Sequence, residues 1–150
     1  MKGKLFLMTM LCATMVSCVS TKSTLKNVDD NAPVPRLKAD NTFVINVNST
    51  DKKYGYDKDY PINVFFKDTK SETLNIERFL NALAGPKGEP ITYKKTETCC
   101  PFPTKRTEIG AGFLDVYEIT WEGNTKPLKL YLNIYEKSVL MVPVGLTLKR

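Results

Sequence analysis

Histidine is absent from this chain of 150 residues, and cysteine occurs only four times. The usual general base for a serine or cysteine nucleophile is therefore missing. A zinc centre is disfavoured as well, because the adjacent thiols of Cys99 and Cys100 fall short of four ligands. Glycine-rich phosphate loops are also lacking, since Gly110-Ala111-Gly112 is too short to form one. We expect no catalytic residue, no metal site and no cofactor.

Clustered positive charge is lacking too, although the formal net charge is +6. The lysines are scattered among acidic residues, and no basic stripe is interleaved with aromatic side chains, so nucleic acid is not expected as a partner. Two carboxylate pairs, Asp57 with Asp59 and Asp115 with Glu118, have no spacing typical of acid–base catalysis. Solvated charge explains them more simply.

Long apolar runs are lacking except at the N-terminus, where Lys2 and Lys4 precede an almost uncharged stretch from Leu5 to Val16. This stretch is shorter than the roughly 20 residues of a membrane-spanning helix and is typical of a signal peptide. We expect residues 1–17 to form that signal peptide.

The junction Ser17-Cys18 resembles the lipobox of bacterial lipoproteins, in which a signal peptidase cuts before a cysteine that then receives acyl chains. Cys12 fits this pattern less well, because bulky Leu11 would occupy the small-residue position. Several acyl chains on Cys18 would anchor the chain to a membrane essentially permanently, since each buried methylene contributes about 0.8 kcal/mol. We therefore predict lipidation, with palmitate among the acyl chains, at Cys18.

Residues 18–41 lack an apolar period and contain Pro33 and Pro35. Polar, proline-containing stretches of this kind are typical of flexible linkers. The sequence predicts a flexible tether over residues 18–41 and a single globular domain over residues 42–150, which is long enough for one modest core.

Alternating apolar residues predict strands in this domain. The clearest are FLDVYEITW (113–121) and LKLYLNIY (128–135), which a turn at 122–125 separates. The expected fold class is α+β, with one small domain and an antiparallel sheet of about five to six strands. The other strands are expected at 42–48, 62–66, 91–94 and 140–146.

One main helix is expected on this sheet, at about 72–84. Gly85-Pro86 follows it as a left-handed cap and a block to continuation, and Ser71 and Asn75 are alternative N-caps. Its apolar positions recur with the helical period, and this face is expected to cover the Leu128–Ile134 side of the sheet. The residues of that face are Ile76, Phe79, Leu80 and Leu83.

Cys99 and Cys100 are the only thiols left once Cys12 is removed and Cys18 is lipidated, and thiols outside the cytosol tend to oxidise. Adjacent Cα atoms lie about 3.8 Å apart, below the usual disulfide range of about 4.4–6.8 Å, so a bridge between neighbours is strained. We expect a vicinal disulfide that fixes a local turn. A redox switch and a plate for ligand stacking are the alternatives, because cations lie nearby in the sequence. Those cations are Lys94, Lys95, Lys105 and Arg106.

Tyrosine is abundant for a domain of this size, with seven in the chain. If they are exposed, Tyr54, Tyr56, Tyr131 and Tyr135 form an aromatic face suited to a peptide or a glycan. The alternative explanation is that half-buried sheets favour aromatic residues in any case.

Several of these stretches together resemble a family of small Bacteroidota lipoproteins. The resemblance is carried by Tyr54-Gly55-Tyr56, FLNALAGPKGE (79–89), CCPF (99–102), GFLDVYEITWEG (112–123), LYLNIYE (130–136) and PVGLT (143–147). Members of this family often carry the label 2-dehydro-3-deoxyphosphooctonate aldolase. That enzyme is a cytosolic (β/α)₈ barrel of about 250 residues. One expected helix and an export signal contradict it, so we treat the label as a misassignment.

The resemblance implies an outer-membrane lipoprotein of the cell envelope. Val19-Ser20-Thr21 lacks the acidic run that resembles a surface-export signal in some Bacteroidota lipoproteins, which favours a periplasm-facing anchor. The expected function is a non-enzymatic binding or accessory module whose partner is an envelope protein or a glycan. The alternative is an enzyme, either the labelled aldolase or a thiol-redox protein that uses Cys99 and Cys100. The sequence leaves the oligomeric state open.

Overall fold

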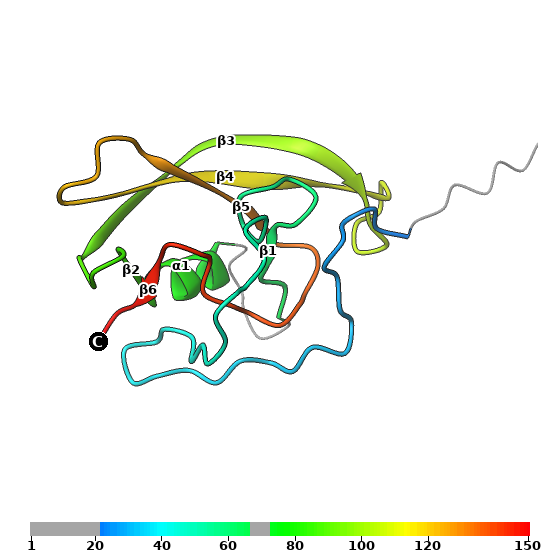
Figure 1. Cartoon of the computed structure of the whole chain (residues 1–150). Coiled ribbons are helices and arrows are strands. Elements are labelled where there is room, and N and C mark those ends of the chain that lie inside the picture. Colours follow the sequence, from blue (N-terminus) through cyan, green and yellow to red (C-terminus); the bar gives the residue numbers. More distant parts are fainter. Residues whose placement is uncertain (1–21, 67–72) are drawn as a thin grey trace, which may run out of the picture.

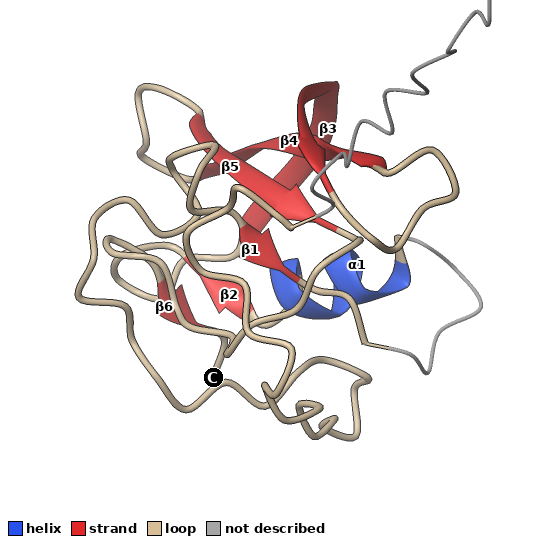
Figure 2. Ribbon diagram, turned by 90° about the vertical axis from the view of Figure 1, so that its right-hand side faces the viewer, coloured by secondary structure: helices blue, strands red, loops and turns tan. Residues whose placement is uncertain are grey.

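The chain folds around three consecutive antiparallel strands, which belong to a sheet of order β1-β5-β4-β3. The computed structural model describes residues 22–66 and 73–150. In Figure 1 and Figure 2 the single helix of the described chain lies on one side of this main sheet, and β2 and β6 form a separate pair. In chain order the elements are β1 (Ile62–Asn63), α1 (Leu74–Leu80), β2 (Leu83–Ala84), β3 (Ile91–Pro103), β4 (Ala111–Trp121), β5 (Leu128–Asn133) and β6 (Thr147–Leu148).

The predicted class, a single small α+β domain, is confirmed. One detail of the sheet differs from the prediction: β1 pairs in parallel with β5, with Ile62 opposite Leu132. The β3–β4 and β4–β5 pairs are antiparallel, as expected. The parallel pair arises because the chain passes from β1 through α1 and the β3–β4 hairpin before it reaches β5, and parallel strands need such a crossover.

The helix ends earlier than predicted, because Leu83 and Ala84, which were expected in its last turn, form the strand β2 instead. α1 ends at Leu80, and β2 then pairs with β6 so that Leu83 lies opposite Leu148. The predicted contact of the helix with β5 is confirmed by one shared core cluster. Its members from these two elements are Ile76, Phe79, Leu80, Leu130 and Leu132.

The start of the helix also differs from both alternatives. Thr73 is the N-cap residue, Asn75 lies inside the helix, and Ser71 lies outside the described residues. The buried side chain of Asn75 donates hydrogen bonds to the carbonyl oxygens of Val64 and Phe66, at 2.9 and 3.3 Å. Asn75 therefore ties α1 to the segment that follows β1.

Gly85 does not take the left-handed conformation predicted for it. Glycine is needed at position 85 for a steric reason. A Cβ atom there would lie 2.6 Å from Oε2 of Glu89 and 3.0 Å from Cγ of Trp121. Real Cβ atoms essentially never lie closer than 3.0 Å to such atoms. Glycine thus allows the backbone after β2 to lie directly against the Trp121 ring.

The predicted strand at 42–48 is not formed. Phe43 and Ile45 are buried, as the alternation predicts, but Val47 is exposed. The backbone makes isolated bridges instead, at Phe43 and at Asn48. The alternation of apolar and polar residues thus correctly predicted burial for Phe43 and Ile45, although this stretch does not pair with a neighbour as a regular strand.

The other predicted strands differ mainly in length. β3 continues well past the expected 91–94 and reaches Pro103, whereas β1 has only two residues. No strand forms at 140–146, and β6 follows immediately afterwards. Pro143 explains this shift, since proline has no backbone N–H to donate to a neighbouring strand.

Residues 22–41, hereafter the N-terminal segment, lie against the domain where the sequence predicted a flexible tether. Leu25 is buried against Phe102 of β3 and Leu114 of β4, and these three residues are called the Leu25 cluster below. The prediction fails for the N-terminal segment because a single buried leucine produces no apolar period in the sequence. Residues 18–21 lie outside the described residues.

Hydrogen bonds fix the N-terminal segment along its first half. The backbone N–H of Lys26 donates to the carbonyl oxygen of Asp59 at 2.8 Å. The amide of Asn27 donates to the carbonyl oxygen of Pro61 at 2.7 Å and accepts from the amide of Asn63 at 3.2 Å. Because Asn63 belongs to β1 and is fully buried, the segment is joined to the main sheet itself.

The two faces of the main sheet are thus covered by different parts of the chain. Tyr117 and Leu130 belong to the large cluster beneath the sheet, whereas Leu114 and Tyr131 belong to or pack on the Leu25 cluster. Successive side chains of a strand point to opposite faces. Alternate residues of the same strand therefore contribute to the large cluster on one face and to the Leu25 cluster on the other. Over residues 22–66 and 73–150, no helix has the length and apolar character needed to cross a membrane.

Candidate binding surface

An open apolar hollow lies at the end of the main sheet where β4 turns into β5. Its volume is about 400 Å³. Trp121 is the last residue of β4 and Leu128 is the first residue of β5, so the turn between these strands places both at the hollow. We call it the Trp121 hollow. The residues that line it are Lys52, Tyr56, Pro86, Trp121, Leu128, Val144 and Gly145.

Tyr56 closes one side of the Trp121 hollow. Its hydroxyl donates a hydrogen bond of 2.6 Å to the carbonyl oxygen of Val144. Burial raises the pKa of Tyr56 to about 12, so the phenol keeps its proton, and this hydrogen bond, at neutral pH. The hydroxyl is already engaged, and the aromatic ring is what Tyr56 offers to a ligand.

The lining of the Trp121 hollow is almost free of polar groups. Lys52 carries its one charge, while the other side chains are aromatic or aliphatic. A ligand held here gains its free energy from apolar contact with the rings of Trp121 and Tyr56 rather than from hydrogen bonds. The chemistry that this arrangement supports is recognition of an apolar group.

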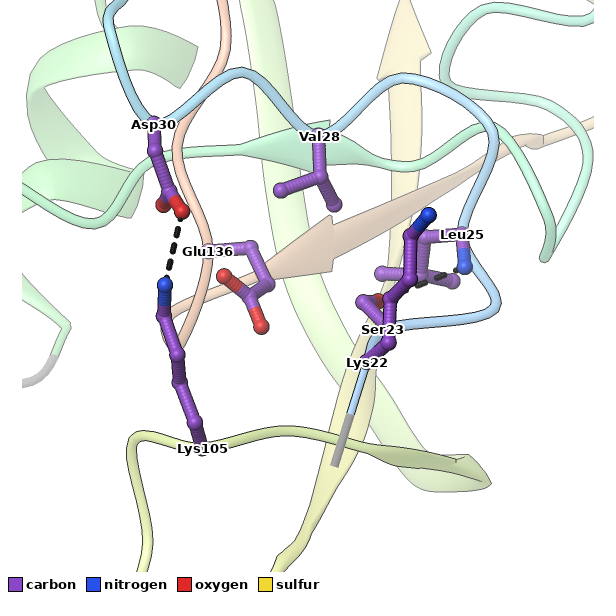
Figure 3. A pocket seen from close by; sticks show the side chains of 7 residues that line it. All are labelled: Lys22, Ser23, Leu25, Val28, Asp30, Lys105 and Glu136. Atoms are coloured by element: carbon purple, nitrogen blue, oxygen red, sulfur yellow. Dashed lines mark hydrogen bonds and ion pairs between the residues drawn. The ribbon is translucent and has the colours of Figure 1, made fainter. Parts of the chain in front are cut away.

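A second and more polar hollow, of about 260 Å³, lies where the N-terminal segment begins (Figure 3). Asp30 pairs there with Lys105 at 2.8 Å and with Arg106 at 2.5 Å. The hydrogen bond from Lys105 lowers the pKa of the Asp30 carboxyl group below its usual value. The residues that line this polar hollow are Lys22, Ser23, Leu25, Val28, Asp30, Lys105 and Glu136.

Glu136 is buried beside the polar hollow, and both of its oxygens are engaged. Oε1 accepts a hydrogen bond of 2.7 Å from the Thr104 hydroxyl, and Oε2 accepts one of 3.1 Å from Nε of Arg106. The guanidinium carbon of Arg106 also lies 4.6 Å from the centre of the Phe65 ring, a cation–π distance. This network holds the N-terminal segment and the chain after β3 together, and it presents no free acid or base.

Cys99 and Cys100 form the expected vicinal disulfide. The pair lies within β3, at an irregularity of the β3–β4 pairing between Cys99 and Phe102, rather than at a turn. Cys100 has a φ of 59° and packs on the Leu25 cluster. The bond therefore occupies a β-bulge on the outer strand of the sheet.

The cations near this disulfide in the sequence are engaged with carboxylates. Lys95 pairs with Asp115 at 2.7 Å, and Lys94 pairs with Glu118 at 3.5 Å. Lys105 and Arg106 belong to the polar hollow, as described above. These contacts account for all four cations that the redox alternative invoked.

The carboxylates considered as acid–base pairs make local contacts. Asp57 accepts a hydrogen bond of 2.9 Å from the backbone N–H of Asp59. Asp115 and Glu118 face the two lysines of β3 just described. In the part of the chain that the structure describes, no three histidine, cysteine, aspartate or glutamate side chains are grouped to hold a metal ion.

The structure does not bring the four candidate tyrosines together in one face. Tyr54 is only 1% exposed, and its hydroxyl accepts a hydrogen bond of 3.1 Å from the backbone N–H of Met141. Tyr131 and Tyr135 are half-buried and pack on the Leu25 cluster, away from the helix side of the sheet. Tyr56 alone of the four lines the Trp121 hollow.

Sequence reasoning missed the other members of the Trp121 hollow. One signal was present: Trp121 is the single tryptophan of the chain, and it directly precedes a turn. Pro86 and Val144 carried no such signal, because loops distant in the sequence bring them to the hollow. Cys18 lies outside the described residues, so its lipidation stays a prediction.

No protein-family model, curated protein or solved structure matches this chain.

Proposed function

We propose that this protein is a lipid-anchored binding module of the bacterial outer membrane, and that its domain holds an apolar side chain of a protein partner in the Trp121 hollow. The anchor is Cys18, and the domain faces the periplasm. The observation that carries the binding role is the hollow itself, in which Trp121 and Tyr56 are open to a ligand among aliphatic neighbours. Aromatic residues in such positions dominate the affinity of many protein interfaces.

A protein partner is favoured over a glycan by the scarcity of hydrogen-bonding groups in the hollow. Sugars present hydroxyl groups that must exchange their bonds to water for bonds to protein. Here the Tyr56 hydroxyl is engaged with Val144, and Lys52 is the one charged donor of the lining. An aliphatic or aromatic side chain needs no such bonds and fits a volume of about 400 Å³.

The enzyme alternatives receive less support. The labelled aldolase is a barrel of eight parallel strands with eight helices, whereas the main sheet here has four strands of mixed direction. The purified protein should therefore not condense phosphoenolpyruvate with arabinose 5-phosphate, and turnover above background would overturn this expectation. The thiol-redox alternative keeps one favourable observation, namely that Cys99 and Cys100 are half-buried rather than enclosed.

Site-specific photocrosslinking in native membranes tests the proposed function. The full-length protein carries benzoylphenylalanine at Leu128, inside the hollow, or at the adjacent Lys129, whose side chain points to the opposite face of β5. We expect a discrete protein–protein product from position 128 and none of that size from position 129. The substitution Val144→Asp places a charge in the apolar lining and should remove the product.

The outcomes of this experiment are decisive. Equal products from positions 128 and 129, or no product from 128, would contradict a partner site at the Trp121 hollow. A product from 128 that contains glycan and no second polypeptide would replace the protein partner with a saccharide. Circular dichroism of the Val144→Asp variant serves as the control for folding, since Val144 lies on an exposed loop.

A further inference from the structure

The described chain begins beside the loop that joins β3 to β4. Lys22 and Lys105 line the same polar hollow, and Lys105 belongs to residues 104–110, hereafter the β3–β4 loop. Figure 1 shows the blue start of the N-terminal segment next to this loop, at the right-hand end of the sheet. The N-terminal segment therefore reaches the domain at this end.

An apolar side chain projects from the β3–β4 loop. Ile109 is 79% exposed, more than any other large hydrophobic side chain of the described residues. The loop is closed by a 3.0 Å hydrogen bond from the backbone N–H of Thr104 to the carbonyl oxygen of Gly110, so Ile109 is carried on a tight turn. Ile109 belongs to neither core cluster of the domain, so its side chain is available to a surface outside the domain.

The length of chain between the proposed anchor and the domain is short. Cys18 lies seven residues before Leu25, the first described residue that is buried in the domain, so the link between them spans at most about 25 Å even when the chain is fully extended. The N-terminal segment is held to the domain from Leu25 and Lys26 onward. A lipid on Cys18 thus keeps the β3–β4 loop close to the bilayer surface.

The Trp121 hollow lies at the other end of the same strand. β4 runs for 11 residues from the β3–β4 loop to Trp121, which at about 3.3 Å for each residue is roughly 33 Å. Figure 1 shows the turn after β4 at the left-hand end of the sheet, opposite the start of the N-terminal segment. One end of β4 is near the anchor, and the other end is distant from it.

We infer that the β3–β4 loop rests on the phospholipid bilayer with Ile109 in its interfacial region, and that the Trp121 hollow is directed away from the membrane. This inference rests on the proposed lipid anchor at Cys18. The contact is apolar rather than electrostatic, because Lys105 pairs with Asp30 and Arg106 pairs with Glu136. It should therefore persist in high salt and on uncharged lipid.

Tryptophan quenching by brominated phospholipid tests this orientation. The full-length protein, purified from membranes, is reconstituted into phosphatidylcholine vesicles with or without bromine on the acyl chains. Native Trp121, the single tryptophan of the chain, should keep nearly all of its emission in the brominated vesicles. The variant Ile109→Trp should lose most of the emission that the added indole contributes.

A matched variant at the other end of the sheet completes the experiment. The variant Val144→Trp also replaces an exposed aliphatic side chain with tryptophan, but position 144 lies beside Trp121 in the hollow. The emission of the indole added there should therefore not be quenched. Equal quenching of the two variants, or quenching at position 144 alone, overturns the inferred orientation. Circular dichroism confirms that each variant is folded before it is reconstituted.

Failure of the anchor is distinguishable from failure of the orientation. Mass spectrometry of the purified protein shows first whether Cys18 carries acyl chains. An unmodified Cys18 overturns both the anchor and the inference that depends on it. A lipidated Ile109→Trp variant whose added indole is not quenched overturns the orientation alone and leaves the proposed binding module standing.

Discussion

Arg106 connects three parts of the molecule through one side chain. It pairs with Glu136 at 3.1 Å and with Asp30 of the N-terminal segment, and it lies over the ring of Phe65. Glu136 is buried, and its two carboxyl oxygens accept hydrogen bonds from this cation and from the Thr104 hydroxyl. A buried carboxylate that loses its partner is costly, because the counter-charge no longer compensates for its desolvation.

Removal of this cation should destabilise the protein strongly. The substitution Arg106→Met should lower the free energy of unfolding by about 3–5 kcal/mol, the usual cost of an orphaned buried charge. Urea titration followed by Trp121 fluorescence measures the change. The control is Lys58→Met, which removes an exposed pair with Asp59 and should change stability by less than about 0.5 kcal/mol. Similar losses in both variants would mean that Glu136 does not depend on Arg106.

The disulfide between Cys99 and Cys100 joins adjacent residues, so it closes no long loop of the unfolded chain. Replacing both cysteines with alanine should therefore change the free energy of unfolding by about 1 kcal/mol or less. Hydrogen exchange should instead become faster at the amides near the bulge, around Phe102 and Leu114. A double variant that fails to fold would give the bond a global structural role. A folded variant that loses partner crosslinking would revive the redox alternative.

The N-terminal segment is the element on which the structure departs furthest from the sequence prediction. A free tether and a docked segment make opposite predictions for Leu25. In the structure this side chain is buried against Phe102 and Leu114, so Leu25→Ala should cost about 2 kcal/mol or more. Val34, which is 56% exposed in the same segment, should tolerate alanine with a change below about 0.5 kcal/mol. Urea titration compares the two, and a neutral Leu25→Ala would restore the tether.

The elements that could be predicted from the sequence are those whose pattern has one dominant cause. β4 and β5 alternate because each strand has one face on the large core, and α1 has an apolar stripe for the same reason. Leu83 continues that stripe, yet its backbone pairs with β6 near the end of the chain. Local periodicity contains no information about such a distant partner, so the helix was predicted too long.

The candidate site was less predictable than the fold, because it is assembled from distant segments. Lys52 and Tyr56 come from the loop before β1, Pro86 follows β2, and Val144 precedes β6. Only Trp121 and Leu128 are joined by a short turn that the sequence reveals. The four candidate tyrosines were predicted to form one binding face, but three of them lie elsewhere. Tyrosine is common at binding faces and also in half-buried sheets, so its abundance does not distinguish the two.

In the proposed function the molecule has two functional ends, one at the lipid anchor on Cys18 and the other at the Trp121 hollow. The N-terminal segment and the β3–β4 loop share one end of the main sheet, and the Trp121 hollow occupies the other. A short link from Cys18 to the docked segment would fix this orientation on a membrane, whereas a long free tether would not. If Cys18 carries the proposed anchor, the docking of residues 22–41 would therefore also determine the direction in which the Trp121 hollow faces.

The anchor itself is tested by replacing the predicted lipidation site. Cys18→Ser should abolish labelling with radioactive palmitate and move the protein from the membrane fraction to the soluble fraction, because acyl chains contribute about 0.8 kcal/mol for each buried methylene. The domain should remain folded, since Cys18 lies before the buried residues of the described chain, which begin at Leu25; an unchanged Trp121 emission spectrum shows this. Cys12→Ser is the matched control and should keep both the label and the membrane location. Persistent labelling of Cys18→Ser, or loss of label in Cys12→Ser, would place the lipid elsewhere and lengthen the link on which the orientation depends.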